Sequence, residues 1–205
     1  MIDNIIFDIG RVLFDYHPHD VVAQLLPNDT NTDFYVTYFH DNDIWQELDH
    51  GTITALEAAE KVCQYQPNTQ THPTIKKNIL HIINHFHLKL PPITPIINLY
   101  KQVLKSHNVY LLTNFQDKPF DNLCQAYPFL TQANGAIVSA KEKCMKPDPQ
   151  IYKLLLKRYQ LNPKKTLFID DKAENIATAQ SLGIYGIIHR TNKETIETVT
   201  KMITL

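Results

Sequence analysis

The chain has 205 residues, 43% of them hydrophobic and 20% charged, a composition typical of one large globular domain or of a core domain with an insertion. Its net charge of −1 excludes the strongly basic surface by which proteins bind nucleic acid or anionic membranes. No apolar run approaches the roughly 18 residues that span a bilayer. No basic segment precedes the first apolar run, so we expect no signal peptide. The three cysteines lack CxxC spacing, which predicts a reduced, cytoplasmic protein.

The first predicted element is a short buried strand at residues 5–7, which places Asp8 at its C-terminal end. Open parallel sheets bind their ligands at this edge, and a carboxylate there acts as a nucleophile, a metal ligand or both. Sites of this kind often carry a second Asp two residues later, where this chain has Gly10. The pattern therefore predicts an enzyme from which one expected acidic group is missing.

Residues 15–90 are predicted to form a helical cap domain, inserted between the first and second strands. Thr54-x-x-Glu57 is a capping box at the start of an apolar-periodic helix, and later isoleucines recur at helical spacing. A crossover between neighbouring parallel strands needs only a dozen or so residues, so most of this segment is additional to the core. A proline-rich stretch marks the return to the core, which we expect to comprise residues 1–14 and 91–205.

Four further apolar runs have strand character and alternate with helical patterns. The runs are residues 109–112, 136–138, 167–169 and 184–188, and the clearest helices between them are residues 151–159 and 173–182. Short strands that alternate with helices are typical of a parallel sheet with helices on both faces. The predicted fold class is therefore α/β, a three-layer Rossmann-like parallel sheet that carries the inserted helical cap.

Polar clusters follow the first four predicted strands. They are Asp8, Thr113-Asn114, Lys146 in the loop after the third strand, and Asp170-Asp171. Parallel strands bring these clusters to one edge of the sheet, where they supply a carboxylate, a hydroxyl, a cation and an acidic pair. Phosphoryl transfer needs such groups, and hard oxygen ligands suit Mg²⁺. Because the chain has no P-loop and no GxGxxG, these side chains would have to hold the phosphate.

In the order and spacing of these clusters the sequence resembles the haloacid dehalogenase superfamily, most of whose members are phosphatases. The resemblance covers essentially the whole chain, and residues 45–54 resemble part of the helical cap in the branch with an insertion after the first motif. It implies that Asp8 is a nucleophile that forms an aspartyl-phosphate on a small phosphorylated substrate. It also implies that Thr113, with adjoining Asn114, binds the phosphoryl group and that Lys146 stabilises its charge.

The same resemblance implies a Mg²⁺ site. Its ligands would be Asp8, the backbone carbonyl of Gly10, and the Asp170-Asp171 pair, with Asp171 the preferred direct ligand of the two.

Gly10 is the departure from the common pattern, because most phosphatases of this superfamily have an Asp there as general acid and base. A smaller branch has Asp-x-Gly-Asn-Val and includes enzymes resembling sugar-1-phosphate phosphatases. This chain has Arg11 in place of that Asn, as a candidate contact to the substrate. Loss of a general acid commonly costs about 10²- to 10⁴-fold in rate. We therefore expect a slow-to-moderate phosphatase that favours acidic leaving groups, such as those of anomeric sugar phosphates.

Two alternatives remain open from the sequence. The first is a catalytically weak phosphate-binding or regulatory protein, motivated by the missing acid at Gly10. The second is a 2-haloacid dehalogenase, whose reaction has no phosphoryl group for Mg²⁺ to serve, so that the Asp170-Asp171 pair argues against it.

Overall fold

Five parallel strands form one sheet within residues 1–204, the part of the chain that the computed structural model describes. Their order across the sheet is β3-β2-β1-β4-β5. The strands are β1 (Asn4–Phe7), β2 (Asn108–Thr113), β3 (Gly135–Val138), β4 (Thr166–Asp170) and β5 (Tyr185–Ile188). Because apolar residues occupy consecutive positions in the central strands, both faces of the sheet are buried.

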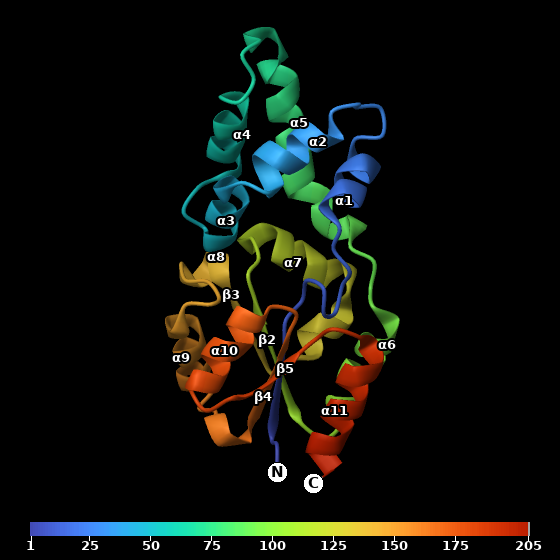
Figure 1. The fold of residues 1–205 in the computed structure, drawn as a ribbon, viewed down its shortest axis with the longest axis vertical. Coiled ribbons are helices and arrows are strands. Elements are labelled where there is room, and N and C mark those ends of the chain that lie inside the picture. Colours follow the sequence, from blue (N-terminus) through green and yellow to red (C-terminus); the bar gives the residue numbers. More distant parts are fainter. Residues whose placement is uncertain (205) are drawn as a thin grey trace.

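Helices cover the sheet on both faces, as the α/β prediction requires (Figure 1). On one face, β-strand residues such as Ile6 and Phe168 pack against α9 (Pro149–Arg158) and α10 (Ala173–Ser181). The other face packs in the larger apolar cluster with helices α6 (Thr94–Val103), α7 (Asp117–Ala126) and α11 (Asn192–Thr204). Short elements α8 (Ser139–Glu142), η4 (Pro128–Gln132) and η5 (Pro163–Lys165) complete this part of the chain.

The register of the central strands places the first and fourth polar clusters side by side. Phe7 pairs with Leu111 of β2 and with Ile169 of β4. The backbone N–H of Asp8 then donates to the carbonyl of Ile169, with 3.0 Å between N and O. Asp8 therefore leaves the sheet beside Asp170, at the carboxyl edge where open parallel sheets bind ligands.

The segment of residues 18–89, which precedes α6 in the chain, is mainly helical and lies beyond the carboxyl edge of the sheet, coloured blue to green in Figure 1. Its elements are α1 (Pro18–Leu25), α2 (Thr32–Tyr35), the π-helical turn η1 (Val36–His40), α3 (Asp43–His50), α4 (Ala55–Cys63), η2 (Thr69–Thr71), α5 (His72–His85) and η3 (Phe86–Lys89). The predicted capping box is present at the start of α4, where Thr54 and Glu57 each bind the other's backbone N–H. The division into a core and a cap at residues 15 and 90 remains a prediction.

Contacts between α3 and α8 hold the inserted helices against the core. The hydroxyl of Ser139 donates to the carbonyl of Asp49, and the Lys143 ammonium donates to the carbonyl of Gly51. Gly51 ends α3 in the left-handed region at φ 72°, and a Cβ at this position would meet the backbone of Ala140. The C-terminus of α3 is thereby fixed over the edge of the sheet.

Across residues 1–204, every helix falls short of the length and apolar character that crossing a bilayer requires.

Candidate active site

A buried lysine between two carboxylates forms the centre of the site. The ammonium nitrogen of Lys146 lies 2.9 Å from Oδ1 of Asp8 and 2.6 Å from Oδ2 of Asp170. Burial raises the pKa of Asp8 to about 7, and Lys146 only partly offsets this effect. Burial acts to lower the pKa of Lys146, but the two carboxylates outweigh it, so that the pKa is raised and the lysine is held as a cation.

The two oxygens of Asp8 have different surroundings. Oδ1 accepts from the backbone N–H of Ile9 at 2.7 Å and also faces the ammonium of Lys146. Both donors engage Oδ1, so they fix the carboxylate at the end of β1 and leave Oδ2 outside these two contacts.

Asp170 differs from Asp8 because hydrogen bonds occupy both of its oxygens. Oδ2 accepts from Lys146, whereas Oδ1 accepts from the backbone N–H of Lys172 at 2.8 Å and from the Asn175 amide at 2.9 Å. With all of these bonds in place, Asp170 positions Lys146 and the turn that leads into α10.

The carboxylates of Asp8, Asp170 and Asp171 form a group that fits a divalent cation. Each offers one oxygen, and the three oxygens all lie within 4.8 Å of one another. Burial raises the pKa of Asp171, and repulsion from the negative charge of the neighbouring Asp170 raises it further. A hard cation would relieve this repulsion, and oxygen donors of this kind suit Mg²⁺.

The two residues of the second polar cluster, Thr113 and Asn114, have different surroundings. The Asn114 side chain accepts from the backbone N–H of Lys146 at 2.8 Å and donates to its carbonyl at 2.9 Å, so that it holds the lysine loop in position. Thr113 is the last residue of β2; it is buried and is not among the residues that line the cavity. Its contact with the phosphoryl group therefore remains a prediction.

A cavity of about 500 Å³ lies between the sheet edge and the inserted helices. The core contributes Asp8, Gly10, Arg11, Asn114, Phe115, Met145, Lys146, Pro147, Asp171, Lys172, Glu174 and Asn175 to its lining, and the insertion contributes Tyr16, His40, Trp45, Gln46, Asp49, Phe86 and Leu90. The predicted site residues other than Thr113 and Asp170 thus reach one space. Most of the aromatic side chains, Tyr16, Trp45 and Phe86, lie on the side of the insertion, so the cavity offers polar groups for a phosphate and an apolar wall for an organic part.

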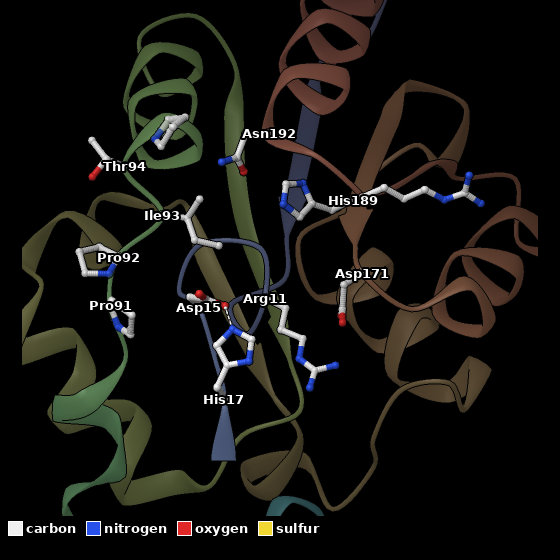
Figure 2. A pocket seen from close by; sticks show the side chains of 12 residues that line it. Arg11, Asp15, His17, Pro91, Pro92, Ile93, Thr94, Asp171, His189 and Asn192 are labelled. Atoms are coloured by element: carbon white, nitrogen blue, oxygen red, sulfur yellow. Dashed lines mark ion pairs between the residues drawn. The ribbon is translucent and has the colours of Figure 1, made fainter. Parts of the chain in front are cut away.

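Gly10 and Arg11 both line this cavity. A Cβ at Gly10 would meet no atom within 4 Å, so the missing side chain leaves open space. Arg11 has a left-handed φ of 57°, and its Nε donates to the Tyr16 carbonyl at 3.4 Å. Figure 2 shows Arg11 and Asp171 in a second, outer groove beside His189; both residues line the two spaces. Arg11 is therefore accessible to a substrate, and its predicted role as a contact stays open.

Sequence reasoning missed the carboxyl of Asp49. Asp49 follows Trp45 by four residues on α3, so the two side chains share a helix face, and both line the cavity. Burial raises the pKa of Asp49 well above its usual range, and Asp8 adds to the effect, while Gln116, Trp45 and Lys172 act against it. The spacing of Trp45 and Asp49 is a signal in the sequence, but it acquires meaning only once α3 is seen to face the sheet edge.

Residues 2–183 match the haloacid dehalogenase-like hydrolase family, so the resemblance predicted from the motifs is confirmed. A D-ribitol-5-phosphate phosphatase of Bacteroides thetaiotaomicron is 28% identical over 194 residues, which cover 89% of this chain and 89% of the relative. A sesquiterpene phosphatase of Aspergillus oryzae is 28% identical over 184 residues, which cover 89% of this chain and 87% of the relative. Both relatives, matched over most of their length, are phosphatases.

The fold is also that of a solved structure from the same superfamily. A haloacid dehalogenase family enzyme from Bacteroides thetaiotaomicron, a mutant in complex with magnesium and inorganic phosphate, superimposes with a TM-score of 0.71 at 24% identity. The superposition covers 93% of this chain and 95% of that enzyme. This likeness confirms the predicted α/β fold.

Proposed function

Because this chain belongs to the haloacid dehalogenase-like hydrolase family, we propose that it is a Mg²⁺-dependent phosphoric monoester hydrolase that acts through an aspartyl-phosphate on Asp8. The observation that carries the proposal is the position of Asp8, held by Lys146 within a group of three carboxylates at the floor of a cavity. Nucleophile, fixed cation and metal ligands are the parts that phosphoryl transfer needs.

The reaction begins with in-line attack of Asp8 Oδ2 on the phosphorus of the substrate. The ammonium of Lys146, 2.9 Å from Asp8, lies beside the developing charge and lowers the barrier without having to reorganise. Asn114 holds the loop that carries this lysine, and Asp170 fixes its ammonium from the other side. Water then attacks the aspartyl-phosphate and releases inorganic phosphate and the free Asp8 carboxylate.

Mg²⁺ would be held by Asp8, the Gly10 carbonyl and Asp171, and it would supply positive charge against the phosphoryl oxygens. The three clustered carboxylates support this assignment, because the charge of Asp170 raises the pKa of both Asp8 and Asp171, a repulsion that a bound cation would relieve.

The substrate class we propose is a small organic phosphate, with a sugar or polyol phosphate as the first candidate. The size of the cavity, about 500 Å³, supports a small substrate. The name of the relative that acts on D-ribitol 5-phosphate supports a polyol. The aromatic wall of Tyr16, Trp45 and Phe86 also suits an apolar organic part, which the name of the sesquiterpene phosphatase supports.

A panel of phosphates tests the proposal. Phosphate release would be measured from ribitol 5-phosphate, sugar 1-phosphates, nucleotides and p-nitrophenyl phosphate, with Mg²⁺ and with EDTA. We expect turnover with Mg²⁺ and its loss with EDTA. Phosphate and Mg²⁺ binding without turnover on any member would favour the phosphate-binding alternative instead. Metal-independent activity on 2-haloacids would favour the dehalogenase.

A further inference from the structure

A phosphatase of this kind needs a group that gives a proton to the departing alcohol oxygen, and position 10 does not supply one. The leaving oxygen of an alkyl phosphate is a strong base, and its expulsion without a proton is slow. Gly10 has no side chain, and the space where a Cβ would stand is open. If the departure of the alcohol is acid-catalysed, the donor has to be another residue that lines the cavity.

Most of the other titratable groups of the cavity are unsuited to this step. Burial raises the pKa of Tyr16 well above its usual value of 10.0, so its proton is held too tightly. Burial lowers the pKa of His40, whose Nδ1 lies 2.8 Å from an oxygen of Asp41, so its imidazole is mostly neutral near pH 7. Lys172 and Glu174 have exposed side chains at the rim. Among the charges around the His40 imidazole, Asp41 raises its pKa, whereas Arg11 and His19 lower it.

Asp49 offers a carboxyl that can hold a proton, and it lies on the side of the cavity where the leaving group departs. Its side chain lines the same cavity as Asp8, and the charge of Asp8 acts on the Asp49 carboxyl. It comes from the inserted helices, opposite the sheet edge, which is the side toward which a leaving group departs when Asp8 attacks in line. Its backbone is held there because its carbonyl accepts from Ser139 of the core.

We propose that Asp49 is the general acid and base of this site, in place of the carboxyl that Gly10 lacks. The inference rests on the proposed phosphatase function and names the residue that moves the proton in it. As Asp8 Oδ2 forms its bond to phosphorus, the bond from phosphorus to the substrate oxygen breaks. That oxygen keeps the bonding electron pair and takes the Asp49 proton, so the products are the alcohol, the aspartyl-phosphate and the Asp49 carboxylate.

The second half of the cycle returns the proton. A water oxygen attacks the phosphorus and gives one proton to the Asp49 carboxylate, while the bond between phosphorus and Asp8 breaks with its electron pair on Asp8. Inorganic phosphate leaves, and both carboxyls regain their starting protonation. The environment of Asp49 favours both states: burial and Asp8 favour the protonated carboxyl, and Lys172, Gln116 and Trp45 favour the carboxylate.

The preference for acidic leaving groups, expected from Gly10, no longer follows. With Asp49 as acid, the wild-type enzyme has no need of acidic leaving groups, and phosphates of ordinary alcohols fall within its range.

The test is the dependence of kcat/KM on the leaving group in wild type and Asp49→Asn. The ratio kcat/KM reports the steps through alcohol release and is not affected by the later hydrolysis of the aspartyl-phosphate. For ribitol 5-phosphate we expect a loss of about 10²- to 10³-fold in Asp49→Asn, because its leaving oxygen needs a proton. For p-nitrophenyl phosphate, whose leaving group is stable as an anion, we expect a loss of less than about threefold.

Two matched variants accompany this measurement. Asp43→Asn makes the same change on the first turn of α3, where the side chain is exposed and does not line the cavity. It should leave kcat/KM unchanged for both substrates. His40→Gln removes the imidazole that lines the cavity and should not steepen the leaving-group dependence of kcat/KM. Equal losses of kcat/KM on both substrates in a folded Asp49→Asn protein would overturn the assignment, as would a selective loss in His40→Gln. Absence of turnover in the wild type would instead count against the phosphatase itself.

Discussion

We expect Lys146 to contribute both to stability and to the proposed reaction. It is 2% exposed and lies between two carboxylates that are buried with it. Removing it leaves Asp8 and Asp170 without the cation that offsets their burial. We expect Lys146→Met to abolish turnover and to lower the free energy of unfolding by about 3–5 kcal/mol, as measured by urea denaturation.

Lys141→Met is the matched control for this change. Lys141 pairs with Asp117 and Asp121 but is half-exposed, so its loss should cost about 1 kcal/mol at most. An equal loss of stability in both variants would contradict the role given to the buried cation.

Gly10 provides a second prediction at the scale of the residue. Since a Cβ there meets nothing within 4 Å, Gly10→Asp should fold with a free energy of unfolding within about 1 kcal/mol of wild type. In the Asp49→Asn background it should raise kcat/KM for ribitol 5-phosphate at least about tenfold, because it restores an acid to the cavity. A folded double variant with no gain would show that position 10 does not reach the leaving oxygen.

The contact between α3 and α8 sets the position of the cap residues over the site. The Ser139 hydroxyl accepts from the backbone N–H of Phe115 at 2.9 Å and donates to the carbonyl of Asp49. Ser139→Ala should cost about 1–3 kcal/mol in free energy of unfolding, because it leaves buried polar groups unpaired.

The same substitution should also lower activity. Displacement of α3 should reduce kcat/KM for alkyl phosphates roughly tenfold, the equivalent of about 1.4 kcal/mol in the barrier. Ser181→Ala is the control, since the Ser181 hydroxyl bonds only within α10 and its neighbourhood is exposed. Unchanged kcat/KM in Ser139→Ala would mean that the hydrogen bond from Ser139 to the Asp49 carbonyl does not position the residues of α3 over the site.

The strands and the polar groups at their ends were predictable from the sequence, whereas the inward face of the insertion was not. Apolar runs such as residues 167–169 end in charged residues, and parallel topology alone brings those ends together. Asp49 faces the site because of the way α3 docks on α8, and helical periodicity reveals only that it shares a face with Trp45. Thr113 illustrates the converse, since its place at a strand end was predictable but its burial away from the cavity was not.

At the scale of the whole molecule, cation binding should couple to folding. Mg²⁺ that binds only the folded chain stabilises it, by about 2.7 kcal/mol at a concentration 100 times its Kd. We expect Mg²⁺ to raise Tm in wild type and to raise it much less in Asp171→Asn, which removes a carboxylate of the group of three. Asp33→Asn, an exposed position on the insertion, should respond as wild type does. Equal shifts in all three proteins would place the cation elsewhere.

Asp8 is the proposed nucleophile in the space between core and insertion, and every later step of the reaction follows from its attack. The most direct measurement is the rate of phosphate release from p-nitrophenyl phosphate with saturating Mg²⁺ in wild type, Asp8→Asn and Asp15→Asn. Asp15 is a half-buried carboxylate that lines the outer groove but not the cavity. We predict that Asp8→Asn is folded and has no turnover, whereas Asp15→Asn retains most of the wild-type rate. A wild-type rate in Asp8→Asn would contradict the mechanism.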